Sequence, residues 1–233
     1  MWRDLIRKAL RPLAVPILRR CTRDLSDDDV WSRTEEHIPA KTFGVGNVHD
    51  WPWYLDGRST VEVKSPKEIV DWLRGCKYVG DSILFHEKDF WQHPLTFENL
   101  RKGDCEDHAL WAWRKLKELG IPAEFVCGRG GPRDAPGNHA HAWIHFDLRG
   151  QRCLMETVAR KRDRMTFPLD EVRRQYCPAL SVDTELKTYR YGGFTEFMRL
   201  QLEAEKRQEK IEKDRTSGSS LRFARGGQND TDP

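Results

Sequence analysis

Apolar residues recur at three- and four-residue spacing between residues 105 and 119, which is the pattern of a helix with one buried face. The recurring positions are Ala109, Ala112, Trp113, Leu116 and Leu119. Cys105 stands four residues before Ala109, so the thiol belongs to the same buried face. The pattern predicts a helix that opens with a cysteine and turns it toward the core.

Capping residues define both ends of this helix. Asp104 has the short acceptor side chain of an N-cap, and Asp107 stands three residues later, where a capping-box carboxylate belongs. Gly120 followed by Pro122 is a stop signal. The unpaired N–H groups and positive end of the helix dipole favour a thiolate at Cys105 and an oxyanion nearby. From this helix alone, a buried structural cysteine is the open alternative.

Residues 138–147 alternate in character and carry strand-forming side chains, so they predict a β-strand. His141, Trp143 and His145 share one face of that strand, because successive side chains of a strand point to opposite sides. An imidazole on this face can be offered sideways to a thiol that another element supplies.

The next segment, residues 152–158, is short and apolar and follows a turn, so we expect it to pair antiparallel with the histidine strand. It carries a single carboxylate, Glu156. In chain order, Cys105, His141 and Glu156 therefore supply a nucleophile, a base and a group that orients the base.

Weaker patterns predict the remaining elements, beginning with a helix that Ser65 caps and Pro66 opens. Trp51 to Leu55 form an aromatic loop, which either lines a substrate groove or is fixed to the core by its rings. The helix that Ser65 caps should span residues 65–75. The other expected elements are helices at 167–172 and 194–213, strands at 123–127 and 182–191, and loops at 80–97 and 128–137.

Gly103–Asp107, Leu119–Ala123, His141–Trp143 and an acid on the following strand together resemble the transglutaminase-like superfamily of papain-like cysteine enzymes. Asp89–Pro94, which leads into the cysteine helix, also resembles the bacterial transglutaminase-like cysteine proteinases. The Gly-Asp-Cys and His-Ala-Trp motifs are specific as a pair, whereas either motif alone is weak.

This resemblance implies an α+β fold with a papain-like/transglutaminase-like core, in which an N-terminal catalytic helix packs on an antiparallel sheet. The domain should span residues 26–200, after a basic arm at 1–25 and before a charged helix at 201–214 and a disordered tail at 215–233. One departure is that the family usually has Asp where this chain has Glu156.

The resemblance also implies that a polar or aromatic side chain upstream of the cysteine helps its backbone N–H to bind the oxyanion. Gln92 is a neutral donor and Trp91 has the better resemblance, so both are candidates. A zinc site from Cys105, His108, His139 and His141 is geometrically conceivable. The resemblance accounts for the cysteine and the strand histidine without metal, so we expect no metal or cofactor and His108 on the helix surface.

Composition indicates a thin core under a charged surface, because only 38% of residues are hydrophobic and 33% are charged. Nine tryptophans offset this, since each can bury a large apolar area. Lys and Arg exceed Asp and Glu by only three, and the body of the chain has no basic stripe, so we expect no nucleic-acid partner.

Six cysteines without a C-x-x-C pair, and no clear signal peptide, favour a reduced, cytoplasmic protein over a secreted three-disulfide framework. Residues 1–20 are basic and apolar, and prolines at 12 and 16 interrupt them. This segment is too short and charged to span a membrane. It is either an arm that contacts a membrane surface or a protein, or a helix that packs on the domain.

These observations predict a cysteine enzyme that acts on an amide bond of a protein or peptide, at a peptide, isopeptide or Gln side-chain carbonyl, through a thioacyl intermediate. Water or an amine can resolve that intermediate, and the resemblance to proteinases favours hydrolysis. The alternative is a non-catalytic interaction module with a papain-like fold.

Overall fold

The computed structural model describes residues 30–130, 140–158, 165–194 and 206 of the 233-residue chain. Backbone contacts divide the chain into two units, Asp24–Phe194 on the one hand and residues 1–23 with 195–233 on the other. The predicted N-terminal arm, charged C-terminal helix and tail lie outside the described residues, apart from Lys206. Within the described ranges, no helix combines the length and apolar character that a membrane span requires.

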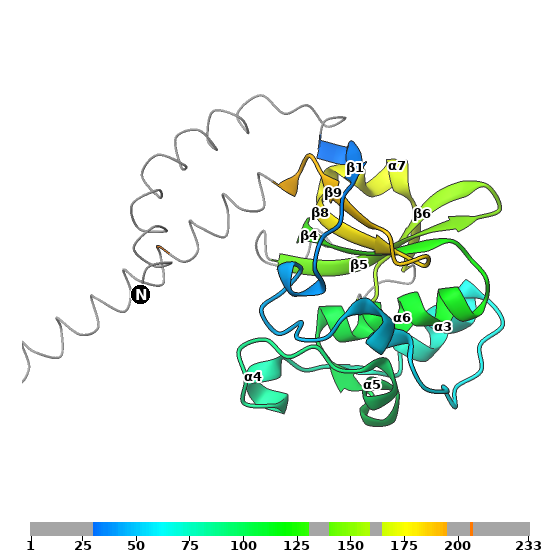
Figure 1. The fold of residues 1–233 in the computed structure, drawn as a ribbon. Coiled ribbons are helices and arrows are strands. Elements are labelled where there is room, and N and C mark those ends of the chain that lie inside the picture. Colours follow the sequence, from blue (N-terminus) through cyan, green and yellow to red (C-terminus); the bar gives the residue numbers. More distant parts are fainter. Residues whose placement is uncertain (1–29, 131–139, 159–164, 195–205, 207–233) are drawn as a thin grey trace, which may run out of the picture. The chain divides into compact units, whose positions relative to one another are not determined.

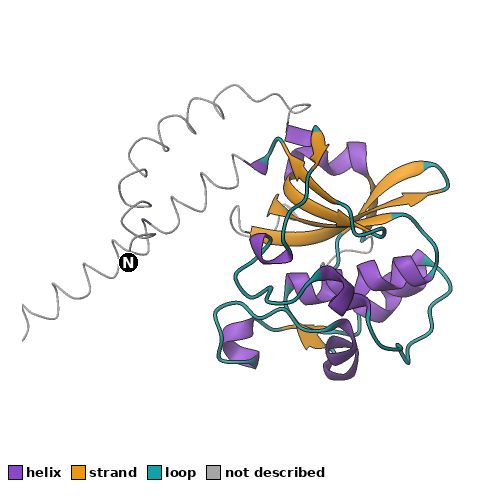
Figure 2. Ribbon diagram, in the orientation of Figure 1, coloured by secondary structure: helices purple, strands orange, loops and turns teal. Residues whose placement is uncertain are grey.

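A seven-stranded antiparallel sheet forms the centre of the Asp24–Phe194 unit (Figure 2). Helix α6 (Cys105–Glu118) contacts β4 and β5, and α7 (Leu169–Val172) contacts β6 and β7 on the other side (Figure 1). The strand order is β1 (Arg33–Glu35), β9 (Thr188–Tyr191), β8 (Tyr176–Asp183), β4 (Ala123–Gly130), β5 (Ala140–Leu148), β6 (Gln151–Met155) and β7 (Thr166–Pro168). This arrangement confirms the predicted α+β fold, with the cysteine helix packed on an antiparallel sheet.

Helix α6 begins at Cys105 as predicted, with Asp104 at the N-cap. The Asp107 carboxylate accepts the Asp104 backbone N–H at 3.3 Å, which is one half of the expected capping box. The helix ends before Gly120, whose φ of +69° is the left-handed conformation that glycine tolerates. The stop signal in the sequence is therefore confirmed.

The buried surface of α6 is wider than one face. Every residue from Glu106 to Leu116 is buried, because α3 (Pro66–Leu73), α5 (Pro94–Leu100) and the 3₁₀ turn η2 (Trp51–Leu55) contact the side away from the sheet. The expectation that His108 lies on the helix surface is consequently wrong. Its side chain is 2% exposed, and its Nδ1 lies 2.7 Å from the Asp104 carbonyl oxygen.

The first half of the chain also carries short elements that surround the start of α6. The segment expected to be loop-rich contains α4 (Asp81–Leu84) and α5, while Ser65 caps α3 as predicted. Strand β2 (Lys77–Tyr78) pairs in parallel with β3 (Lys102–Gly103) and brings Tyr78 opposite Gly103. A residue 27 positions upstream of Cys105 is thereby set beside it.

Aromatic side chains fill the core beneath α6. Trp51 contacts Phe43, Trp91, Trp113 and Phe125, with ring-centroid distances between 4.7 and 6.4 Å. The aromatic loop is therefore fixed to the core by its rings, as one of its two interpretations expected, and tryptophans carry much of the buried apolar area.

The end of the domain differs from the sequence prediction in two of its elements. The single strand expected at 182–191 is two strands, β8 and β9, because the Asp183 carboxylate accepts the backbone N–H groups of Glu185 and Lys187 and closes a turn there. The helix expected at 167–172 is only the four-residue α7, after strand β7.

The described cysteines are free of disulfides. They are Cys76, Cys105, Cys127, Cys153 and Cys177.

Candidate active site

His141 and Glu156 form a buried ion-pairing couple across β5 and the end of β6. His141 Nε2 lies 2.9 Å from Glu156 Oε2 and 3.1 Å from Oε1. The carboxylate is fully buried, and the imidazole is 10% exposed. The predicted base and its predicted orienting carboxylate are therefore in contact.

Glu156 is held by two further donors. The Tyr176 hydroxyl donates to Oε2 at 2.8 Å, and the Val158 N–H donates to Oε1 at 3.2 Å. Burial alone would raise the pKa of Glu156, but the His141 ring and these two donors hold it below its ordinary value. Sequence reasoning missed Tyr176, since no motif spacing connects it with the other site residues.

The ends of β5 and β6 are offset at the positions of His141 and Glu156. Strand β6 pairs with Ile144–Leu148 only, so the first residues of β5 extend past its end and Glu156 follows immediately after it. At this open edge, the backbone of Ala142 lies close enough to the Cys105 thiol to lower its pKa. The first residue of α6 therefore lies against the residue that follows His141.

The surroundings of Cys105 oppose the thiolate that a helix N-terminus would favour. Its Sγ donates to Glu106 Oε2 at 3.2 Å. Burial, and then the carboxylates of Glu106 and Asp104, raise the pKa of the Cys105 thiol well above its ordinary value, while the Ala142 backbone lowers it in part. In this geometry the neutral thiol is the favoured form.

Several carboxylates gather around the start of α6. They come from α4, from the loop that contains Asp89, and from the start of α6 itself. Single oxygens of Asp81, Asp104 and Asp107 lie within 4.8 Å of one another, as do those of Asp81, Asp89 and Glu106. Burial raises the pKa of Asp81 to about 6, and it raises the pKa values of Glu106 and Asp107 well above their ordinary range. Among the described residues, Asp81 Oδ1 and Asp104 Oδ1 are buried and have no hydrogen-bond partner.

An all-oxygen donor set of this kind suits a hard cation, whereas zinc prefers nitrogen and sulfur. Among the described residues, the zinc set considered from the sequence does not gather. Its Cys105 groups with Asp104 and Glu106, and its His108 bonds to a backbone carbonyl. His139 lies outside the described residues.

The two oxyanion candidates from the sequence have their N–H groups engaged elsewhere. The side-chain amide of Gln92 donates to the Lys102 carbonyl at 3.0 Å and to the Asp107 carboxylate, and its backbone N–H also donates to Asp107. The Trp91 indole donates to Asp89 at 3.0 Å. Both side chains are buried, and Gln92 supports the start of α6 through its bonds to Asp107.

Tyr78 is a second residue that sequence reasoning missed. Its ring is 49% exposed and stacks at 6.4 Å from the ring of His108, one turn beyond Cys105. Burial, and then the charges of Cys105 and Asp104, raise the pKa of Tyr78. Within the described part of the chain, no hydrogen bond engages its hydroxyl. It is therefore a donor available beside the thiol.

Comparison with known families confirms the resemblance. The family model described as the transglutaminase-like superfamily matches residues 54–153, which include Cys105 and His141 and end three residues before Glu156. No curated protein matches the chain.

Three solved structures of LapG from Legionella pneumophila are similar to the chain at 19% sequence identity. One is calcium-bound and another is EGTA-treated. The similar region covers 62% of this chain and 81% or 83% of LapG, with TM-scores of 0.39 or 0.40.

Proposed function

We propose that this chain, whose residues 54–153 match a transglutaminase-like core, is a cysteine enzyme that acts on an amide bond of a protein or peptide. Hydrolysis is the favoured outcome, with transfer to an amine as the variant of the same chemistry. The observation that carries this proposal is the buried His141–Glu156 couple at the open edge of β5, where the backbone of the next residue, Ala142, lies close enough to lower the pKa of the Cys105 thiol.

The proposed reaction follows from the atoms that are free to act. Glu156 occupies Nε2 of His141, so Nδ1 is the ring nitrogen that exchanges protons with Cys105. The thiol proton passes to Nδ1 as Sγ attacks the carbonyl carbon, and Glu156 stabilises the imidazolium that forms. The imidazolium then protonates the departing amine, which leaves a thioester on Cys105.

A second half-reaction releases the acyl group. His141 takes a proton from water, the resulting hydroxide attacks the thioester, and the proton returns to the Cys105 sulfur. If an amine enters instead of water, the product is a new amide bond. Both outcomes use the same residues, so a substrate assay has to distinguish them.

The negative charge of the tetrahedral intermediate needs donors near Cys105. We assign this role to the Cys105 backbone N–H at the start of α6 and to the Tyr78 hydroxyl. The engaged N–H groups of Gln92 and Trp91 make them supports of this site, in place of the direct donors expected from the sequence.

The raised pKa of Cys105 also bears on the mechanism. A protonated Cys105 thiol must lose its proton during the attack, in contrast to a thiolate that exists beforehand. The reaction of Cys105 with an alkylating agent should therefore depend on His141.

Two measurements on the full chain test the proposal. Iodoacetamide labelling from about pH 4 to 9, resolved for each cysteine by mass spectrometry, should proceed more slowly at Cys105 when His141 is changed to Ala. Cys76 and Cys177 serve as internal controls, because their labelling should not change.

The second measurement is turnover of a peptide mixture that contains Gln residues and isopeptide links, with and without a primary amine. We expect cleavage that is lost in Cys105→Ala and His141→Ala variants of unchanged circular dichroism. Retained turnover in the Cys105→Ala protein would exclude the proposed nucleophile.

The raised thiol pKa is the observation that favours the second candidate function, a non-catalytic interaction module with the same fold. Equal labelling of Cys105 with and without His141, together with no turnover, would favour that module.

A further inference from the structure

A pocket of about 250 Å³ lies on the α7 side of the sheet. None of the residues that line it belongs to the proposed active site. Its walls include Trp31, Arg33, Arg152, Arg173 and Tyr191, and His145 of β5 also lines it. The pocket is therefore separate from the proposed site of amide chemistry at Cys105.

His145 offers this pocket a neutral donor. Its side chain is 1% exposed, and its Nε2 accepts the Trp143 indole N–H at 2.8 Å. Burial, and then the charges of Arg152 and Arg33, keep its pKa well below the ordinary value, so the ring is neutral and its proton sits on Nδ1. Within the described residues, no hydrogen bond engages that N–H.

The carboxylate beneath the pocket has no capacity left for a further donor. Arg33 and Arg152 both bond to Glu124 Oε1. Oε2 accepts the hydroxyls of Ser181 and Tyr191, each at 2.9 Å. Two guanidinium groups thus share one carboxylate oxygen, and both retain N–H groups at the pocket wall.

Arginine and aromatic side chains also contribute to the rest of the pocket wall. The Arg173 guanidinium lies 6.0 Å from the Trp31 ring, and that ring lies 5.4 Å from the ring of His145. Asp170 is the acidic residue among those that line the pocket, and Asp147 reaches Arg152 from the surface at 3.3 Å. A molecule entering the pocket meets three guanidinium groups, one imidazole N–H and aromatic faces.

We propose that this pocket binds a small anion, carrying a carboxylate or a phosphate, between the guanidinium groups of Arg33, Arg152 and Arg173 and the Nδ1–H of His145. Arginine forks match the planar or tetrahedral oxygen geometry of both groups, and a buried neutral donor adds a bond that bulk water cannot replace. The site is independent of the proposed function, because it uses neither Cys105, His141 nor Glu156.

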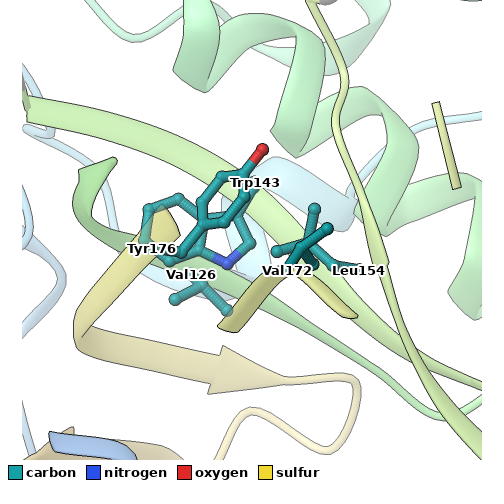
Figure 3. Packing of buried hydrophobic residues seen from close by; sticks show 5 residues of the cluster. All are labelled: Val126, Trp143, Leu154, Val172 and Tyr176. Carbon is teal, nitrogen blue, oxygen red and sulfur yellow. The ribbon is translucent and has the colours of Figure 1, made fainter. Parts of the chain in front are cut away.

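The contact between His145 and Trp143 provides a local reporter. Trp143 is a buried member of the cluster with Val126, Leu154, Val172 and Tyr176 (Figure 3). Its indole N–H bonds to the same imidazole that would bind the anion, so its NMR resonance should move when the pocket fills. A Trp143→Phe variant assigns that resonance.

The test is a titration of the full chain with inorganic phosphate and, separately, with malonate, at constant ionic strength set by chloride. Calorimetry measures affinity, and the Trp143 resonance locates the site. We expect saturable binding of at least one of the two anions, with a shift of the Trp143 indole resonance. Which anion binds more tightly distinguishes a phosphate from a carboxylate ligand.

Arg33→Met should weaken binding about tenfold or more, because it removes a charged hydrogen-bond donor from the wall. The matched control is Arg190→Met on β9. It breaks the ion pair between Arg190 and Glu36 and should leave the affinity for the anion unchanged. No saturation by about 10 mM of either anion would overturn the proposal. Binding that leaves the Trp143 resonance in place would also overturn it.

Discussion

The two halves of the candidate active site differ in how well their polar groups are satisfied. The Glu156 carboxylate receives three donors, from His141, Tyr176 and the Val158 backbone, and its pKa is lowered despite complete burial. At the start of α6, by contrast, Asp81 and Asp104 each keep a buried oxygen that no group in the described part of the chain bonds to. The base is fully supported, whereas the nucleophile lies among unsatisfied carboxylates.

This difference determines which group holds the reacting proton before the reaction begins. Hydrogen bonds to a carboxylate favour its charged form, so Glu156 is poised to hold an imidazolium at His141. Burial and like charges favour the protonated forms of Glu106, Asp107 and the Cys105 thiol. In the proposed mechanism, the proton therefore starts on the sulfur and moves to His141 only during attack.

We expect the largest loss of activity when Glu156 is changed, because it belongs to the part of the site whose buried carboxylate oxygens both have hydrogen-bond partners. Changing Glu156 to Gln removes the charge that stabilises the imidazolium, so kcat/KM should fall about 10²- to 10⁴-fold. Tyr176→Phe removes only one of the donors to that carboxylate and should cost far less. An unchanged kcat/KM in the Glu156→Gln protein would mean that another carboxylate orients His141.

Tyr78→Phe tests the oxyanion side of the nucleophile half. If the hydroxyl binds the intermediate, its loss should lower kcat about 10²-fold with little change in KM, as for other oxyanion donors. Tyr189→Phe is a matched control on β9, where the hydroxyl bonds to Asp183. Equal kcat values for the wild-type and Tyr78→Phe proteins would remove Tyr78 from the mechanism.

The smallest expected effect comes from relieving the unsatisfied half. Burial favours the protonated form of Glu106, so its charge raises the thiol pKa of Cys105 only once Glu106 ionises. Glu106→Gln removes that charge, so iodoacetamide labelling of Cys105 should accelerate about tenfold at alkaline pH, at about pH 9, and change little at neutral pH. Glu185→Gln, at an exposed turn, is the control. Slower labelling in the Glu106→Gln protein would show that this carboxylate assists the thiol.

The same Glu106→Gln variant should change how stability depends on pH. The pKa of Glu106 is raised in the folded state, so its contribution to stability is present below its ordinary pKa and is lost as pH rises through the folded value. The variant should thus gain a few degrees in Tm relative to wild type at high pH, and less at low pH. Glu156 has the opposite sign, since its lowered pKa makes its contribution disappear as pH falls below about 4.5.

Local signals in the sequence were sufficient for the skeleton of the site. Asp104 and Gly120 delimit α6 because caps depend on neighbouring residues alone. Alternation predicted the strand of His141, and the turn after it predicted antiparallel pairing with the segment that leads to Glu156, which follows directly after β6. The family resemblance supplied the grouping of the three proposed catalytic residues, which no local pattern contains.

Features set by distant segments could not be predicted in this way. The burial of His108 depends on α5, and the position of Tyr78 depends on a parallel pairing with Gly103. The raised pKa of Cys105 was missed for a related reason. The helix dipole favours a thiolate, but the buried carboxylates of Glu106 and Asp104 dominate once the fold brings them close.

One arrangement on β5 has an optical consequence. The Trp143 indole lies between two imidazoles, with ring centroids 5.9 Å from His141 and 6.1 Å from His145. A protonated imidazole quenches indole emission by accepting an electron, and a neutral one does so far less. The fluorescence of this tryptophan, isolated by subtracting the spectrum of a Trp143→Phe protein, should therefore dim as His141 takes up its proton. Trp143 fluorescence should thus report the protonation state of the proposed base, His141.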